Sequence, residues 1–202
     1  MPLLPRSVVL LAWSCLAFCS GLGLAGIIYF SGRVFDARDL VISDLVSPDD
    51  NPRGYAVGAA GIAMASLLLV PGVMRNHLRL RVADQRLAWA GTLLTGAGLT
   101  AALAIGVLAP MTHDYTFLHV QLAFAAFIGV CAGTTTHLAA ARQRSWAVLG
   151  FESCVLLFLG YLYFHPRFFG NTGLVDSLAF LEWLLCANCA VLLWLACYAK
   201  PQ

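Results

Sequence analysis

The chain has 202 residues, of which 60% are hydrophobic and only 11% are charged, whereas soluble proteins carry roughly 25% charged residues. This composition excludes an ordinary soluble domain and a disordered chain, and a net charge of +2 gives no support for a nucleic-acid partner. A mean hydropathy of +0.82 instead indicates an integral membrane protein.

Six apolar stretches are long enough for a membrane-spanning helix, which needs about 20 such residues. They cover residues 7–30, 55–74, 87–110, 117–141, 146–164 and 177–199. Their apolar residues are continuous and do not alternate, which favours helices over a transmembrane barrel. The first stretch lacks a clear cleavage site and is expected to be retained. The sequence therefore predicts an all-α protein in which residues 1–202 form one six-helix transmembrane bundle.

Basic residues predict the topology, because cytoplasmic loops carry an excess of Lys and Arg. With the N-terminus inside, eight of the 12 basic residues lie inside, and only Arg33, Arg38, Arg53 and Arg167 lie outside. Both termini are therefore expected in the cytoplasm, with the active face exoplasmic or lumenal. The first outer loop, residues 31–54, is long for a compact bundle and is expected to be functional. Its residues 34–45 are expected to lie along the membrane as a short amphipathic segment.

All seven cysteines lie within the predicted helices. Cys186 and Cys189 have the spacing of a thiol redox pair, but in a continuous membrane helix we interpret them as small packing residues. The glycines at positions 58, 61, 91, 129 and 133 are expected to let helices approach closely. These features predict architecture and carry no chemistry.

Ionisable residues near membrane depth are the main functional signal, because their burial is costly. The predicted topology brings ten polar residues to the outer half of the bundle, around one outward-opening cavity. The set comprises Ser43, Asp44, Arg53, His113, Asp114, His119, His165, Arg167, Asp176 and Glu182. Two histidines are expected to have other roles: His77 in solvent and His137 as an interfacial anchor at the inner end.

An imidazole beside carboxylates suits general acid–base chemistry. His119 is the expected base, and Glu182 or Asp114 is expected to orient its ring. Asp44 belongs to the same candidate catalytic group, and the Ser43 hydroxyl is either a nucleophile or a helix cap. The non-catalytic alternative is that His119 and Glu182 only hydrogen-bond to each other across a helix interface.

Lipid head groups carry phosphates or carboxylates, which Arg side chains bind well. Arg53 and Arg167 are therefore the expected anchors, with His113, His165 and Asp176 beside them in the binding group. The same histidines and carboxylates could make a zinc site, but no pair of histidines has the usual ligand spacing. No cofactor is expected, and zinc stays an open alternative.

Several stretches of this sequence resemble the damage-regulated autophagy modulator (DRAM) superfamily, which includes the Sfk-type proteins and the post-GPI-attachment lipid-remodelling factor. The resemblance covers most of the chain from about residue 40 onward. Its residues are Ile42, Ser43 and Asp44; 51–55; 75–78; His119 with Phe124, Phe127 and Ile128; 163–165; and 179–183. The remodelling factor carries cysteines in its outer loops, and this chain has none there.

The resemblance implies lipid handling at the exoplasmic or lumenal leaflet, through acyl transfer to, or hydrolysis of, a phospholipid or GPI-like glycolipid. It implies roles for Ser43, Asp44, Arg53, His119, His165 and Glu182. The main alternative is a non-catalytic lipid-binding or scaffold protein, which would hold lipid with its bonds intact. A channel or transporter comes third, because it needs a polar path across the whole membrane. The oligomeric state is not predicted.

Overall fold

The computed structural model describes residues 6–108, 111, 115–164 and 178–199, without the side chains of residues 115–117, 157, 161–164 and 178. Regular structure in this part of the chain is helical, which confirms the predicted class. The elements are α1 (Arg6–Tyr29), the 3₁₀ helix η1 (Ala37–Asp39), α2 (Ile42–Leu45), α3 (Tyr55–Leu80), α4 (Gln85–Val107), α5 (Tyr115–Ala140), α6 (Arg144–Phe164) and α7 (Leu178–Tyr198). Within the described residues, α1, α3, α4, α5 and α7 are long and apolar enough to cross a membrane.

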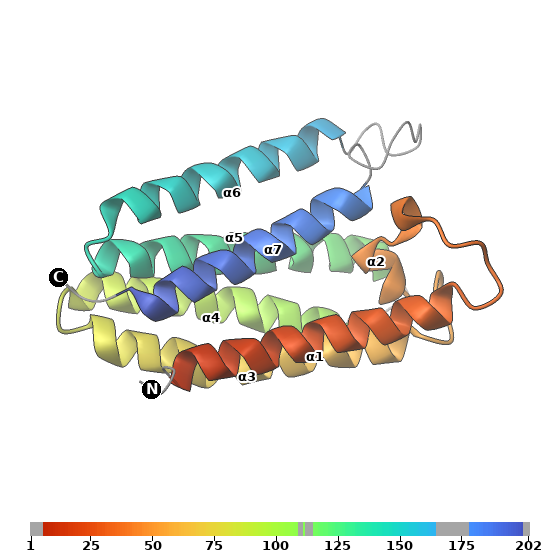
Figure 1. Cartoon of the computed structure of the whole chain (residues 1–202), viewed down its shortest axis with the longest axis horizontal. Helices are drawn as coiled ribbons and strands as arrows, with labels where there is room; N and C mark the ends of the chain where they lie inside the picture. The colour runs from red at the N-terminus through yellow and green to blue at the C-terminus, as the bar shows by residue number, and fades with distance from the viewer. Residues whose placement is uncertain (1–5, 109–110, 112–114, 165–177, 200–202) are drawn as a thin grey trace, which may run out of the picture.

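The long helices lie side by side along one axis (Figure 1). Helix α1 packs on α3, α3 on α4 and α4 on α5, while α7 contacts both α1 and α5. Helix α6 lies at the edge of the bundle against α5 and α7. Helices α3, α5 and α7 begin at the end that holds α2, which we call the α2 end. Helix α1 begins, and α7 ends, at the opposite end (Figure 1).

Glycines produce the closest helix contacts, as the sequence predicted. A Cβ on Gly61 would lie 2.8 Å from the Cα of Gly21, so α1 and α3 touch backbone to backbone. A Cβ on Gly129 would lie 2.7 Å from the Cα of Gly98, which brings α4 and α5 equally close. Such contacts matter in a membrane because helix association there depends on close packing and has little hydrophobic driving force.

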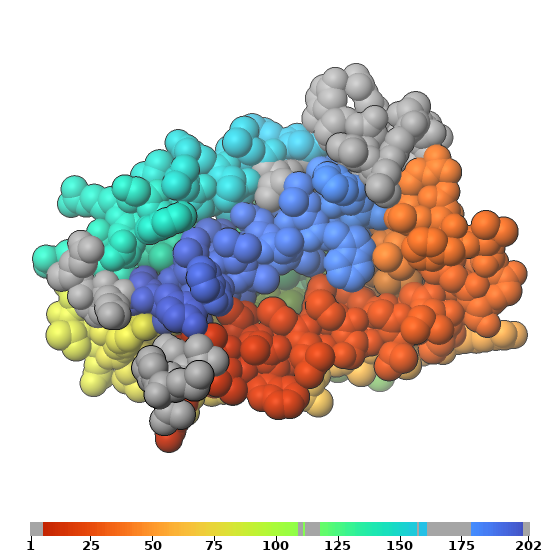
Figure 2. All heavy atoms as spheres, in the orientation of Figure 1, coloured from red at the N-terminus to blue at the C-terminus, as the bar shows by residue number. Residues whose placement is uncertain are grey.

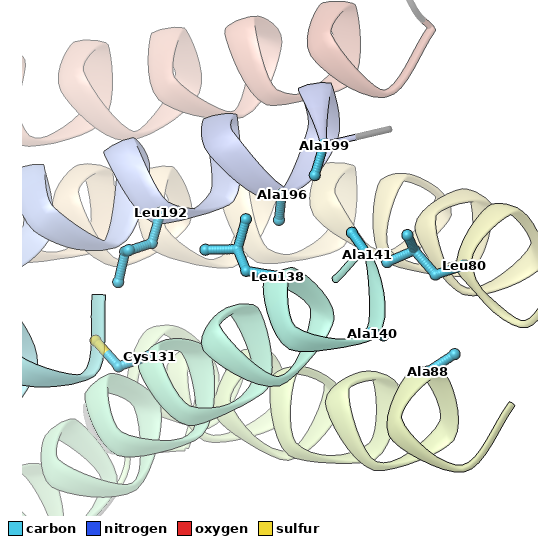
Figure 3. Close-up of a cluster of buried hydrophobic side chains, with 9 residues drawn as sticks. All are labelled: Leu80, Ala88, Cys131, Leu138, Ala140, Ala141, Leu192, Ala196 and Ala199. Atoms are coloured by element: carbon cyan, nitrogen blue, oxygen red, sulfur yellow. The ribbon is translucent and has the colours of Figure 1, made fainter. Parts of the chain in front are cut away.

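Apolar cores occupy both ends of the bundle. At the opposite end, Leu138 of α5 packs with Leu192 and Ala196 of α7, and Leu80 closes the cluster from α3 (Figure 3). At the α2 end, a second cluster combines the α2 segment with α1, α3 and α4. Its centre is Leu45, whose side chain is fully buried.

Two sequence predictions about this architecture are wrong. The segment 34–45 does not lie along the membrane as one amphipathic helix, because α2 is inserted into the bundle with Ile42 and Leu45 buried. Helix α3 does not end at residue 74 but continues to Leu80. Its last turns stay helical because Asn76, His77 and Leu80 are buried against neighbouring helices.

Candidate functional site

Glu182, in the second turn of α7, holds the short helix α2 in place. Its Oε2 accepts hydrogen bonds from the backbone N–H groups of Ile42 (2.6 Å) and Ser43 (3.2 Å), and its Oε1 accepts one from the Ser43 hydroxyl (3.1 Å). The N-cap residue of α2, Val41, has no side chain that could accept these bonds. Free N–H groups at a helix start need an acceptor, and a carboxyl group is a favourable one. Glu182 therefore caps α2 from a different helix.

The neighbouring Trp183 fastens the same loop at a second point. Its indole N–H donates a hydrogen bond to the carbonyl oxygen of Leu40 (2.9 Å). Its ring also meets Phe18 of α1 edge to face, with centroids 6.3 Å apart. Glu182 and Trp183 together tie the first loop and α1 to the start of α7.

Asn51 fixes the end of the same loop, and sequence reasoning missed its role. Only 3% of Asn51 is exposed, and its amide donates to the carbonyl oxygens of Ala25 (3.2 Å) and Leu45 (3.0 Å). Its side-chain oxygen accepts from the N–H of Gly54 (3.1 Å), where a Cβ would lie 2.7 Å from the Asn51 amide. An Asn three residues before the glycine that caps the start of a helix was the available signal, because Asn commonly bonds to nearby backbone.

Behind α2, the bundle contains a cavity of about 340 Å³, which we call the bundle cavity. Five long helices contribute to its wall, whereas none of the α6 residues whose side chains the structure describes does. Most of the lining is apolar, and the hydroxyls of Ser14 and Ser66 along it already bond to the carbonyl oxygens of Ala65 and Ile62. The described lining residues are Leu11, Ser14, Cys15, Phe18, Cys19, Ile42, Ser43, Ile62, Ala65, Ser66, Leu69, Leu99, Ala102, Ile105, His119, Ala123, Ala126, Phe127, Val130, Glu182, Trp183, Cys186, Ala187, Cys189, Ala190 and Leu193.

Three of the predicted site residues meet at the α2 end of this cavity. His119 reaches it from the start of α5, Ser43 from α2 and Glu182 from α7. His119 is 7% exposed, so its imidazole is buried beside an apolar space. The bundle cavity thus combines a long apolar body with a polar end that carries an imidazole, a hydroxyl and a carboxyl group.

Asp44 and Arg53 lie near this end without lining the bundle cavity. Asp44 is half-buried, and burial, reinforced by the charges of Asp50 and Asp39, raises its pKa to about 6. Arg53 is exposed at the start of the turn that leads into α3. Their catalytic and head-group roles stay predictions.

Five further predicted site residues lie outside the described residues: His113, Asp114, His165, Arg167 and Asp176. The structure therefore does not place them, and their roles in binding or orientation stay predictions. In the part of the chain that is described, no group of three or more His, Cys, Asp or Glu side chains could hold a metal ion.

The seven cysteines are free thiols, and the contact between them differs from the one their spacing suggested. The Sγ atom of Cys189 lies 3.6 Å from that of Cys131, which joins α7 to α5 across the bundle. Cys186 and Cys189 both line the bundle cavity. The described thiols form no disulfide, and Cys131 and Cys189 pack between two helices.

The opposite end of the bundle holds a polar cluster that sequence reasoning did not anticipate. His77 was expected in solvent, but only 3% of it is exposed, and its ring packs at a tilt of 51° against Trp89, with centroids 4.2 Å apart. Arg79 donates to the last carbonyl oxygens of α7, those of Ala196 and Cys197, at 2.6 Å each. A cation at a helix C-terminus is favourable, so this cluster joins α3 to the end of α7.

His137 also belongs to that end and is almost fully buried, at 1% exposure. Its Nε2 lies 3.2 Å from the Thr92 hydroxyl, and a Cβ on Gly91 would collide with its ring at 2.4 Å. It is therefore a packed contact between α4 and α5, where the sequence predicted an interfacial anchor.

No family model matches the chain, and neither the curated proteins nor the solved structures include a match. The resemblance to the DRAM superfamily therefore stays a prediction, and the functional argument depends on the site itself.

Proposed function

We propose that all six long helices cross a bilayer, with the α2 end at the exoplasmic or lumenal face. Five of them meet the length and hydropathy of a membrane span, and α6 runs alongside them (Figure 1). Eight of the 12 basic residues belong to the end where α1 begins and α7 ends, or to the chain beyond it. That excess supports a cytoplasmic location for this end.

Within this topology the protein binds a membrane phospholipid or glycolipid and takes an acyl chain into the bundle cavity. The observation that carries this function is a mostly apolar space of about 340 Å³ whose imidazole and carboxyl groups, those of His119 and Glu182, lie at one end. Ligand pockets commonly begin at roughly 300 Å³ and combine an apolar lining with a few convergent polar groups. A lipid has the same division, because its hydrocarbon chain is apolar and its ester and head group accept and donate hydrogen bonds.

The test uses two neighbouring alanines of α5. Ala126 lines the bundle cavity, whereas Ala125 is exposed on the outside of the same helix. Ala126→Phe places a ring in the cavity, and Ala125→Phe adds the same ring outside it. Mass spectrometry of lipids that co-purify in detergent is expected to show bound lipid in the wild type and Ala125→Phe, and loss of it in Ala126→Phe. Equal lipid content in the three proteins would contradict the proposed function.

A second candidate function is lipid remodelling, supported by the meeting of His119, Ser43 and Glu182 at one end of the bundle cavity. In this reaction His119 takes a proton from a lipid hydroxyl or from water, and the freed oxygen attacks the carbonyl carbon of an acyl ester. The ester C–O bond breaks, and the leaving oxygen receives the proton back from the imidazolium. The acyl chain is thereby transferred to the lipid or released by hydrolysis.

The two functions differ in the state of the lipid after incubation. Purified protein is incubated with a lysophospholipid and an acyl-ester donor, and its products are followed by mass spectrometry. Remodelling predicts new acylated or deacylated species with the wild type and none with His119→Ala, while both proteins still contain bound lipid. Unchanged lipid with both proteins would refute the reaction and leave the binding or scaffold function.

A further inference from the structure

A second apolar cavity lies beside the first, on the outer side of α1. It measures about 360 Å³ and is formed by the second half of α1, the loop that follows it and the start of α7. We call it the α1 groove. Its wall includes Gly23, Ile27 and Phe30 of α1, Phe35 and Leu40 of the loop, and Trp183 of α7.

The α1 groove is open to the surroundings of the bundle. Ile27 is 71% exposed and Phe35 is 65% exposed, so the groove borders the surface that a bilayer would cover. Figure 2 shows this face, where α1 and α7 meet along a seam with green atoms of the middle of the chain visible deep within it. The outer groove and the inner cavity therefore approach each other along one line between the two helices.

Trp183 and Cys19 line both spaces, so the bundle cavity and the α1 groove share a wall. The indole is fixed there by its hydrogen bond to the Leu40 carbonyl oxygen (2.9 Å) and by its contact with Phe18. Two apolar spaces of similar volume thus lie on either side of the Trp183 indole ring, which these contacts keep in place. Both lie near the α2 end, where the polar groups of the site are.

We infer that the ligand is a lipid with two acyl chains that straddles Trp183, one chain in the bundle cavity and the other in the α1 groove. This inference depends on the proposed lipid-binding function and specifies its substrate class. The two chains of a diacyl lipid leave adjacent carbons of one backbone and run side by side, which matches two adjacent apolar spaces with a common wall. A lipid with a single chain fills the bundle cavity and leaves the groove without a specific partner.

Two glycines provide a matched test. A Cβ on Gly23, in the wall of the α1 groove, would meet nothing within 4 Å, so Gly23→Phe introduces a ring at the groove from an unobstructed backbone position. A Cβ on Gly96 of α4 also meets nothing within 4 Å, and Gly96 lines neither space. Gly96→Phe therefore adds the same ring to another exposed helix surface.

The experiment measures competition between dipalmitoyl phosphatidylcholine and palmitoyl lysophosphatidylcholine for the purified full-length protein, by native mass spectrometry. Wild type and Gly96→Phe are expected to prefer the two-chain lipid. In Gly23→Phe this preference is expected to fall about tenfold, equivalent to about 1.4 kcal/mol, while binding of the lysolipid is unchanged.

Equal binding of the two lipids by the wild type, or an unchanged preference in Gly23→Phe, would overturn the two-chain assignment. These outcomes are distinguishable from failure of the proposed function. If Ala126→Phe still removes lipid, lipid binding stands and only the second chain is lost. If Ala126→Phe has no effect on either lipid, the bundle cavity itself is not the binding site and both proposals fall.

Discussion

Removal of the Glu182 carboxyl group is expected to release α2 from the bundle while the long helices stay assembled. Glu182→Ala eliminates three hydrogen bonds, at 2.6, 3.2 and 3.1 Å, that join α7 to Ile42 and Ser43. A typical intramolecular hydrogen bond contributes roughly 0.5–1.5 kcal/mol, and loss of an N-cap typically costs about 1 kcal/mol. For the three bonds together we expect a total cost of about 2–4 kcal/mol.

Amide hydrogen exchange measures this release directly. A cost of 2 kcal/mol in local opening corresponds to roughly 30-fold faster exchange, and it is expected at the amides of Ile42 and Ser43. Glu152→Ala is the matched control, since Glu152 is an exposed carboxyl group on α6. Unchanged exchange in residues 42–46 of Glu182→Ala would refute the capping role, as would equal acceleration in both variants.

Three other predictions test separate parts of the account. Burial raises the pKa of Asp44 to about 6. Ionisation of this carboxyl group therefore destabilises the folded protein as the pH rises from about 4 to 6. The melting temperature of Asp44→Asn should be higher than that of the wild type at pH 7.5 and equal to it at pH 4. Mild copper–phenanthroline oxidation should join Cys131 to Cys189, whose Sγ atoms lie 3.6 Å apart, and peptide mapping that finds Cys189 joined to Cys186 instead would contradict the α5–α7 packing. Gly61→Ala should lower stability by about 1–3 kcal/mol, because its Cβ would lie 2.8 Å from the Cα of Gly21; an unaltered melting temperature would count against that contact.

Hydropathy was sufficient to predict the long helices. The spacing of the glycines was sufficient to predict where helices approach closely. Apolar runs of this length have few alternatives in a membrane, because the backbone must satisfy its own hydrogen bonds there. The end of α3 was misplaced because Arg75, Asn76 and His77 are polar, and polarity alone suggests a loop. Asn76 and His77 are buried, and their burial depends on partners from α7 and α4 that no local pattern of α3 contains.

Three of the ten candidate site residues could be grouped from the sequence around one cavity, but their contacts could not be predicted. The expected depth of each residue in the membrane, and the expected side of the membrane, grouped Ser43, His119 and Glu182, and the three line one cavity. That Glu182 caps α2 could not be predicted, because the two partners are 140 residues apart in sequence and the capped helix has only four residues. The role of Trp183 was missed for the same reason, since its partner Leu40 contributes only a backbone carbonyl.

The central claim is that an acyl chain occupies the inside of the bundle, and photo-crosslinking tests it most directly. Phosphatidylcholine with a diazirine midway along one chain is incorporated with the protein into nanodiscs, illuminated, and the adducts are mapped by peptide mass spectrometry. The account predicts adducts on cavity-facing residues such as Phe127 and Leu193, which excess unlabelled lipid removes. Adducts confined to exposed residues such as Ile128 and Val191 would contradict it.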